Sequence, residues 1–182
     1  MADIITFDEA RQRVTEKMNL SELIARAVDL IGDRAEEESD DLLVADEQRL
    51  EIIFERTISG ILLRRKLLDP GFFICSRYIA VLLKRVSSSV PESWYAVDYF
   101  TKGIREERPE LIRQGADICF LFCSVFLERS SHRNMNFGSY SKMGAGLYYN
   151  FYLSTGRDIG CFMARKFDIM TEVTRQCFMS LK

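Results

Sequence analysis

Histidine is almost missing from this chain, whose 182 residues contain only His132. A histidine-based catalytic dyad would have to use this one imidazole, and a zinc site would have to draw mainly on scattered cysteines. The Glu-x-x-His pair that holds di-iron centres in helical bundles is absent from the sequence as well. We therefore expect no metal and no cofactor, and a non-enzymatic protein rather than an enzyme.

Proline and glycine are also scarce, with three and ten residues, which leaves little material for the turns of an all-β fold. Each proline stands directly before an apolar segment of helical period. Proline is favoured at the first helical position because its missing N–H would have no partner there. Pro70, Pro91 and Pro109 therefore predict three helix starts, and Asp69 is a good cap for the first of them.

No apolar run is long enough to cross a bilayer, since the most apolar stretch covers only residues 118–127. The N-terminus lacks the basic start and apolar core of a secretory signal. The five cysteines are odd in number and lie within apolar helical patterns, which favours free buried thiols over disulfides. We therefore expect a protein of the reducing cytoplasm that does not enter a membrane.

The formal net charge of −2 gives the chain no overall field that would attract nucleic acid or an acidic membrane. Charge is nevertheless uneven along the sequence. Residues 33–47 carry eight acids and one arginine, a net charge of −7, while residues 60–90 carry six bases and one acid, a net of +5. Solvated loops and helix ends are the ordinary interpretation. The alternative is an electrostatic docking surface, for which Arg64, Arg65 and Lys66 are the candidates.

Nucleic-acid binding is a weaker hypothesis. Residues 129–182 carry eight bases and three acids, a net charge of +5, which permits contact with phosphates. These bases are scattered along the sequence, however, and the whole chain is close to neutral. Both features argue against a nucleic-acid partner.

Apolar residues recur at helical spacing along the whole chain, and no segment alternates with the period of a strand. We predict an all-α fold without a β-sheet, a compact bundle of about seven or eight helices in one domain, residues 1–182. A short helical pair at about 6–32 and an acidic connection at about 33–41 would lead into the main bundle. The main helices are expected near 41–68, 71–87, 91–104, 109–129, 139–155 and from 158 onwards.

The end of the chain predicts a tight helical hairpin. Gly156 is placed to stop one helix and Asp158 to cap the next. The last helix then carries a narrow apolar seam. Its residues are Ile159, Met163, Phe167, Met170, Val173, Cys177 and Leu181.

The helix expected at 139–155 contains Gly144 and Gly146, each of which costs about 1 kcal/mol relative to alanine. Close contact with a neighbouring helix would offset this cost. Ser141, Gly144 and Ala145 are small enough to form such a face.

Several polar residues are candidates for binding a ligand or a partner. Arg77 and Asp117 lie in strongly apolar surroundings, so each must be paired or lie at a surface edge or cavity, and a pair between the two is one way to meet this need. The helix at 139–155 also presents tyrosines that suit either packing or a ligand pocket. His132 is most simply a solvated loop residue that titrates near neutral pH. The candidates are Arg77, Asp117, His132, Tyr148, Tyr149 and Tyr152.

Two functional hypotheses follow. The first is a non-enzymatic cytoplasmic helical protein that acts through protein contacts, as a regulator, adaptor or assembly subunit, with a protein partner or a second copy of itself. An exposed patch with Tyr148, Tyr149 or Trp94 would be a natural contact point. The alternative is a small-molecule-binding protein or enzyme with a pocket between helices, lined by the polar candidates.

Overall fold

The computed structural model describes residues 42–89, 91–125 and 137–180, and every regular element in these ranges is a helix. The all-α class is therefore confirmed for this part of the chain. Seven or eight helices were expected for the whole chain, and six lie in the described ranges. The predicted pair at 6–32 and connection at 33–41 lie outside them. The helices are α3 (Leu42–Arg64), α4 (Pro70–Ser88), α5 (Ala96–Arg105), α6 (Pro109–Ser124), α8 (Phe137–Thr155) and α9 (Asp158–Ser180).

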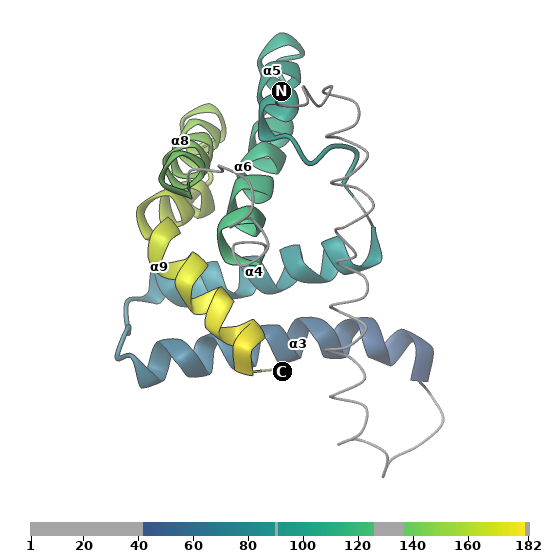
Figure 1. Cartoon of the computed structure of the whole chain (residues 1–182), viewed down its shortest axis with the longest axis vertical. Coiled ribbons are helices and arrows are strands. Elements are labelled where there is room, and N and C mark those ends of the chain that lie inside the picture. The colour runs from purple at the N-terminus through teal and green to yellow at the C-terminus, as the bar shows by residue number, and fades with distance from the viewer. Residues whose placement is uncertain (1–41, 90, 126–136, 181–182) are drawn as a thin grey trace, which may run out of the picture.

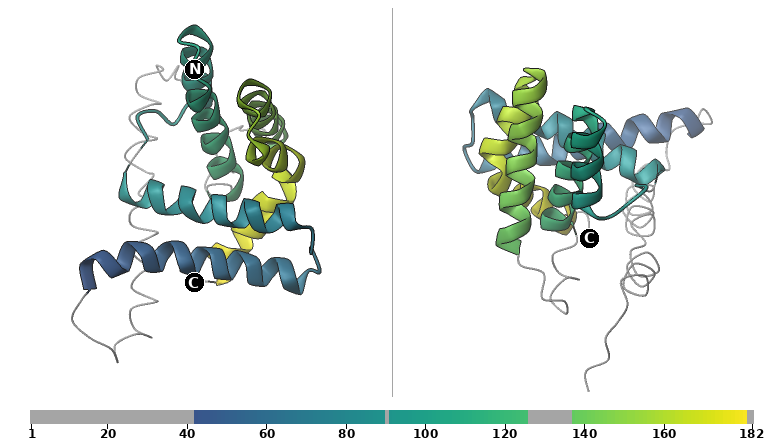
Figure 2. Two further views of the ribbon diagram at one scale, coloured as in Figure 1. Left: turned by 180° about the vertical axis from the view of Figure 1, so that it is seen from behind. Right: turned by 90° about the horizontal axis from the view of Figure 1, so that it is seen from above.

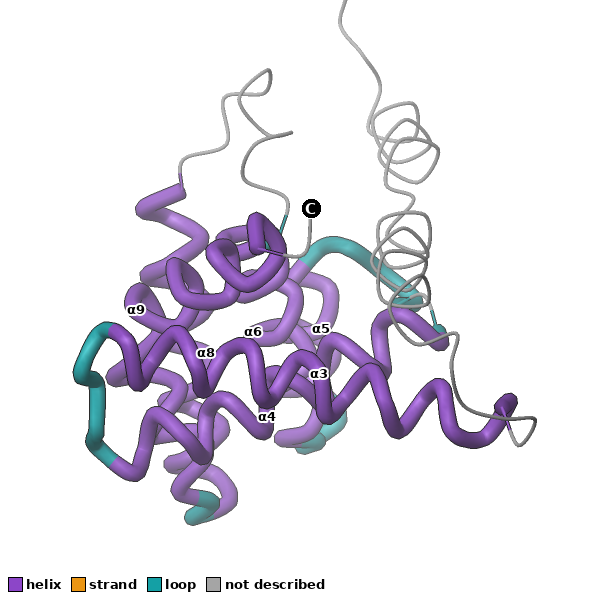
Figure 3. Tube along the Cα trace, turned by 90° about the horizontal axis from the view of Figure 1, so that it is seen from below, coloured by secondary structure: helices purple, strands orange, loops and turns teal. Residues whose placement is uncertain are grey.

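The helices form two groups (Figure 1). α3 and α4 run antiparallel as one pair, and α6 stands across this pair with α5 and α8 packed against it. α9 leaves the end of α8 and packs against α3, α4 and α6. Figure 2 shows the same arrangement from behind and from above, and Figure 3 shows that the described loops are short connections at the helix ends. α9 is thus the helix that packs against both groups.

The core takes apolar side chains from every described helix. Most of α6 is buried, which agrees with the strongly apolar run seen in its sequence. The predicted seam of α9 is confirmed from Met163 to Cys177, whose members are all buried, while Ile159 is half-buried and Leu181 lies outside the described residues. Phe167 of this seam meets Phe120 of α6 edge-to-face, with ring centroids 5.6 Å apart.

The helix starts agree only in part with the proline signals. Asp69 caps α4 by accepting a hydrogen bond of 2.7 Å from Gly71 N, and Pro70 is the first residue of α4. α6 begins at Pro109. α5, however, begins at Ala96, so the expected start at Pro91 is wrong. Ser93 accounts for the difference, because its hydroxyl accepts from Tyr95 N and donates to Asp98, which forms a turn before the helix.

α3 ends at Arg64, earlier than the expected 68. Lys66 adopts a left-handed backbone conformation with φ of 58°. Leu67 N donates to Leu62 O, and Lys66 N donates to Leu63 O, both at 3.0 Å. This is the hydrogen-bond pattern of a Schellman ending, which usually has glycine at the left-handed position. Because a lysine occupies that position, the sequence gives no sign that the helix ends there.

The tight hairpin between α8 and α9 is confirmed. Gly156 has φ of 68° and donates a backbone hydrogen bond of 2.7 Å to Tyr152 O. Asp158 is the first residue of α9 rather than a cap before it. The two helices approach closely after the turn, because a Cβ placed on Gly160 would lie 2.7 Å from Tyr148 O.

The two glycines of α8 have different surroundings. A Cβ on Gly144 would lie 2.5 Å from Phe167 Cζ and 2.8 Å from Cys119 Cβ, so the predicted close packing is confirmed there. A Cβ on Gly146 would have no neighbouring atom within 4 Å. The packing explanation is therefore wrong for Gly146, which lies on the exposed side of the helix.

Exchanging each of these glycines for alanine tests this difference. Gly144→Ala should destabilise the protein by about 1–3 kcal/mol, because the added methyl group overlaps Phe167 and Cys119. Gly146→Ala should stabilise it by about 1 kcal/mol through helix propensity alone. Urea unfolding of the two matched variants measures both effects. Equal effects from the two substitutions would contradict the packing described.

Candidate functional site

A buried carboxylate links three of the helices. The Asp117 side chain, on α6, is only 2% exposed. Its Oδ1 accepts hydrogen bonds from the hydroxyls of Tyr78 (2.5 Å) and Tyr148 (2.7 Å). Its Oδ2 accepts from Arg85 Nη2 (2.8 Å) and Arg113 Nη1 (3.2 Å). We call these five residues the Asp117 cluster; it joins α4, α6 and α8.

The cluster continues toward the surface through Arg113. Arg113 Nη1 also donates to the Tyr78 hydroxyl (3.1 Å), and its Nε donates to Glu110 Oε2 (2.9 Å). Glu110 Oε1 accepts in turn from Arg157 Nη1 at 2.7 Å. Three arginines therefore share two carboxylates, and this connected set of charges has a net charge of +1.

Helix periodicity explains how these residues come together. Arg113 and Asp117 are four residues apart on α6, so they share one face of the helix. Tyr78 and Arg85 are seven residues apart on α4, which is close to two turns, so both point the same way. The backbones of α4 and α6 scarcely approach each other. The long tyrosine and arginine side chains of α4 span the distance.

The two tyrosines are hydrogen-bond donors in their neutral form. Burial raises the pKa of the Tyr78 and Tyr148 hydroxyls, and the negative charge of Asp117 raises it further. Both hydroxyls therefore keep their protons at neutral pH. With two donors on each oxygen, the acceptor sites of the carboxylate are fully used.

The candidates from the sequence end up in different places. Arg77 does not meet Asp117; it is largely exposed and lies 3.7 Å from Glu55 on α3. Tyr148 is buried and belongs to the Asp117 cluster. His132 lies outside the described residues.

The other two tyrosines of α8 lie nearer the surface. Tyr149 is 48% exposed, and Tyr152 is partly buried beside it, with ring centroids 6.1 Å apart. Of the patch expected around Tyr148, Tyr149 and Trp94, only Tyr149 is exposed; Trp94 is buried.

Three members of the cluster were missed in the sequence, namely Tyr78, Arg85 and Arg113. The spacing Arg113–Asp117 was a usable signal, since oppositely charged residues four apart commonly pair on a helix. The sequence could not show that Arg85, rather than Arg77, pairs with Asp117. Both arginines lie on α4, and only the rotation of α4 about its axis decides which one faces α6.

The basic end of α3 is only partly accessible. Arg65 Nη2 pairs with Glu172 Oε1 of α9 at 2.7 Å. Arg64 and Lys66 are exposed. Arg64 and Arg65 also line a shallow hollow of about 360 Å³ between the ends of α3 and α9, beside Gln176 and Met179.

The outer face of α8 is exposed and almost uncharged. We define it by Ser139, Lys142, Gly146, Tyr149, Asn150 and Leu153, which are all exposed. Lys142 is the only charged residue in the 19 residues of the helix. Leu153 is 62% exposed and lies one turn from Tyr149.

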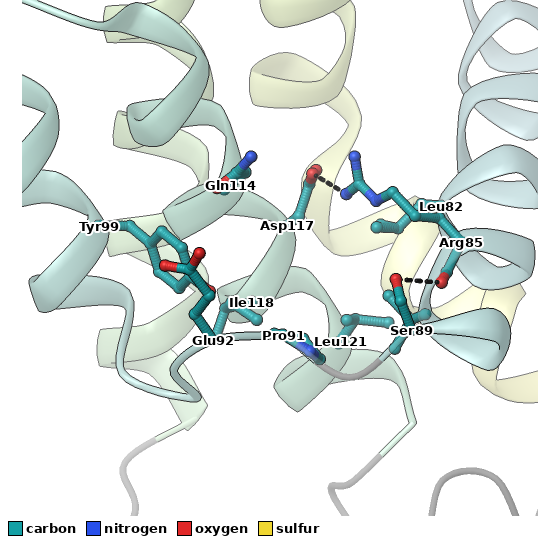
Figure 4. A pocket seen from close by; sticks show the side chains of 11 residues that line it. Leu82, Arg85, Ser89, Pro91, Glu92, Tyr99, Gln114, Asp117, Ile118 and Leu121 are labelled. Atoms are coloured by element: carbon teal, nitrogen blue, oxygen red, sulfur yellow. Dashed lines mark hydrogen bonds and ion pairs between the residues drawn. The ribbon is translucent and has the colours of Figure 1, made fainter.

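A pocket of about 210 Å³ lies beside the Asp117 cluster (Figure 4). Its apolar wall includes Leu82 and Val86 from α4 and Ile118 and Leu121 from α6. Its polar lining includes Arg85, Ser89, Glu92, Tyr99, Gln114 and Asp117. We call it the Arg85 pocket, since Arg85 links it to the cluster.

Four of the five cysteines are buried in the core, and Cys161 is half-buried. Burial raises the pKa of four of the thiols to about 12, which keeps them protonated at neutral pH. These thiols are Cys75, Cys119, Cys123 and Cys177. Across the described residues, no three His, Cys, Asp or Glu side chains are grouped so that they could hold a metal ion. None of the described helices combines the length and apolar character needed to span a bilayer.

No protein-family model matches the sequence, and no curated protein or solved structure is significantly similar to it.

Replacing Asp117 tests the importance of the cluster. Asp117→Asn should destabilise the protein by roughly 3–5 kcal/mol, because the amide group cannot compensate Arg85 and Arg113. Arg77→Gln is the matched control and should change stability by less than about 0.5 kcal/mol, since Arg77 is exposed. Urea unfolding followed by circular dichroism measures both. An Asp117→Asn protein as stable as the control would show that the cluster contributes little.

Proposed function

We propose that this is a non-enzymatic cytoplasmic protein that acts through protein contacts, as a regulator, adaptor or assembly subunit, and that the outer face of α8 is its docking surface. One observation carries this proposal: a largely exposed helix face has almost no charge, and the space beside the glycine at its centre, Gly146, is empty. The composition and shape of this face support a docking role. The carboxylate of Asp117, whose acceptor sites are all used, supports a role without catalysis.

The composition of this face is typical of interface cores, which are depleted in charged residues and enriched in tyrosine. Tyr149 and Leu153 add two large, exposed apolar groups one turn apart. Tyrosine is common among residues that contribute most to binding energy, because it combines a large apolar ring with a hydroxyl. An ordinary solvent-facing helix would carry several charged residues here.

The shape of the face suits another helix. Lys142, Gly146, Tyr149 and Leu153 are spaced by four, three and four residues, which is the spacing of a helix–helix seam. Gly146 costs about 1 kcal/mol relative to alanine, and no contact within the described part of the chain requires it. Its missing side chain leaves a notch where a second backbone can approach closely.

The Asp117 cluster supports a structural role rather than a catalytic one. A catalytic carboxylate needs a free position for a proton or a substrate atom. Asp117 already receives four donors from the protein itself. The carboxylate is thus best suited to holding α4, α6 and α8 in their relative positions.

Arg64 and Lys66 are the accessible part of the proposed electrostatic contact, because Arg65 is engaged with Glu172. These two cations would add salt-dependent attraction to an acidic partner surface. They form a second, weaker part of the proposal.

Native mass spectrometry of the protein purified gently from its own cells tests the docking face. We expect a mass at a multiple of the 21.1 kDa chain, or with another polypeptide attached. Tyr149→Glu/Leu153→Glu should abolish that complex, because it places two charges in an apolar interface. Val81→Glu is the matched control, since Val81 is an apolar residue on α4 that is 45% exposed, and it should leave the complex intact.

A third variant, Arg64→Glu/Lys66→Glu, reports on the electrostatic part and should weaken the complex most at low salt. Complexes that survive the α8 variant, or that are lost equally with Val81→Glu, would refute the proposed face. Gly146→Ala adds an independent check, because it should stabilise the isolated chain yet weaken the complex.

A further inference from the structure

The Arg85 pocket is lined by one cation and by several apolar side chains (Figure 4). Arg85 lines it from α4, Gln114 and Asp117 line it from α6, and Arg85 points toward Asp117. Leu82 and Ile118 belong to its apolar part. A pocket of this kind combines the two features that small organic anions require, namely apolar contact area and a few well-placed polar groups.

Among the described residues that line the pocket, Arg85 is the one cation, and Asp117 and Glu92 are the acids. Arg85 uses Nη2 to bind Asp117, and its side chain as a whole is 42% exposed. The connected set of Arg85, Arg113, Arg157, Asp117 and Glu110 has a net charge of +1. Glu92 is the one acid of the rim; it is 86% exposed and lies 4.0 Å from Lys102, which offsets its charge.

The size of the pocket favours a compact ligand. Its volume of about 210 Å³ lies below the roughly 300–1,000 Å³ typical of pockets for drug-sized molecules. An inorganic anion such as phosphate would leave the apolar wall of the pocket without a contact. A ligand with a carboxylate on a short apolar body would contact both the apolar wall and Arg85.

We propose that the Arg85 pocket binds a small monocarboxylate. The ligand's carboxylate lies against the N–H groups of Arg85 that do not bind Asp117 and against the side-chain amide of Gln114. The ligand's apolar body lies on Leu82, Ile118 and Leu121. Arginine suits this role because its planar group binds carboxylates through paired, charge-assisted hydrogen bonds. The pocket is separate from the outer face of α8, so this inference does not depend on the proposed docking function.

Binding there would also strengthen the link between α4 and α6. The ligand would rest on residues of both helices and hold Arg85 in place beside Asp117. A ligand that binds only the folded state raises its stability. The thermal midpoint should therefore rise with ligand concentration.

The test compares benzoate with benzamide, which is nearly identical in shape but uncharged. In a two-dimensional ¹H–¹⁵N NMR titration of the full chain, benzoate should shift the Arg85 Nε and Gln114 side-chain resonances saturably, with a dissociation constant on the order of 1 mM. Benzamide should bind at least about tenfold more weakly, because it lacks the charge-assisted hydrogen bonds. Inorganic phosphate should bind more weakly than benzoate.

Two variants separate loss of binding from loss of folding. Gln114→Phe narrows the pocket and leaves the Arg85–Asp117 pair in place, and it should abolish the benzoate shifts while the protein stays folded. Arg77→Gln removes an arginine of α4 that lies outside the pocket and should change nothing.

Three results would overturn the proposal. The first is the absence of saturable shifts at Arg85 and Gln114. The second is equal affinity for benzamide or phosphate, and the third is unchanged benzoate binding by Gln114→Phe.

Discussion

The carboxylate of Asp117 is the interaction on which the arrangement of the helices depends. Burying an isolated charge is costly, and removing any of its partners would leave that cost uncompensated. Asp117 meets this constraint with two hydroxyls and two guanidinium groups that come from α4, α6 and α8. All four donors reach the carboxylate in the observed placement of the three helices. Apolar packing alone tolerates more than one arrangement, and a satisfied polar cluster selects among them.

Both proposed surfaces follow from that placement. Tyr148 must point inward to reach Asp117, and this fixes the rotation of α8 about its own axis. Tyr149, Gly146 and Leu153 then face outward as an uncharged surface. On the other side, Arg85 must cross from α4 to α6, and its side chain forms a wall of the Arg85 pocket. The buried charge thus helps to position both the proposed docking face and the Arg85 pocket, which Asp117 also lines.

The sequence predicted features that depend on local spacing. The Asp69 cap, the seam of α9, the hairpin at Gly156 and the close packing at Gly144 each arise from neighbouring residues or from one helix face, so pattern is sufficient to find them. The need for a partner at Asp117 was also visible, because a charge within an apolar run must be paired or reach solvent. Its actual partners were not, since they depend on how separate helices rotate and cross.

Other misses have equally local causes. Lys66 adopts a left-handed conformation, with φ of 58°, that glycine normally occupies, so the end of α3 gave no signal. Gly146 looked equivalent to Gly144, and only the position of the neighbouring helices distinguishes them. A glycine without an internal contact is informative for the same reason. At Gly146 the missing side chain leaves a notch on the exposed side of α8, which is why the docking proposal centres on it.

A double-mutant cycle between Tyr148 and Asp117 tests the central claim most directly. The free energy of unfolding is measured for the wild type, Tyr148→Phe, Asp117→Ala and the double variant, all in the stabilised Gly146→Ala background. If the tyrosine hydroxyl stabilises the fold by binding the carboxylate, its removal should cost about 1–3 kcal/mol with Asp117 present and much less without it. The coupling energy should then exceed about 0.5 kcal/mol. Additive effects of the two substitutions would contradict a role for this carboxylate in holding α8 in place.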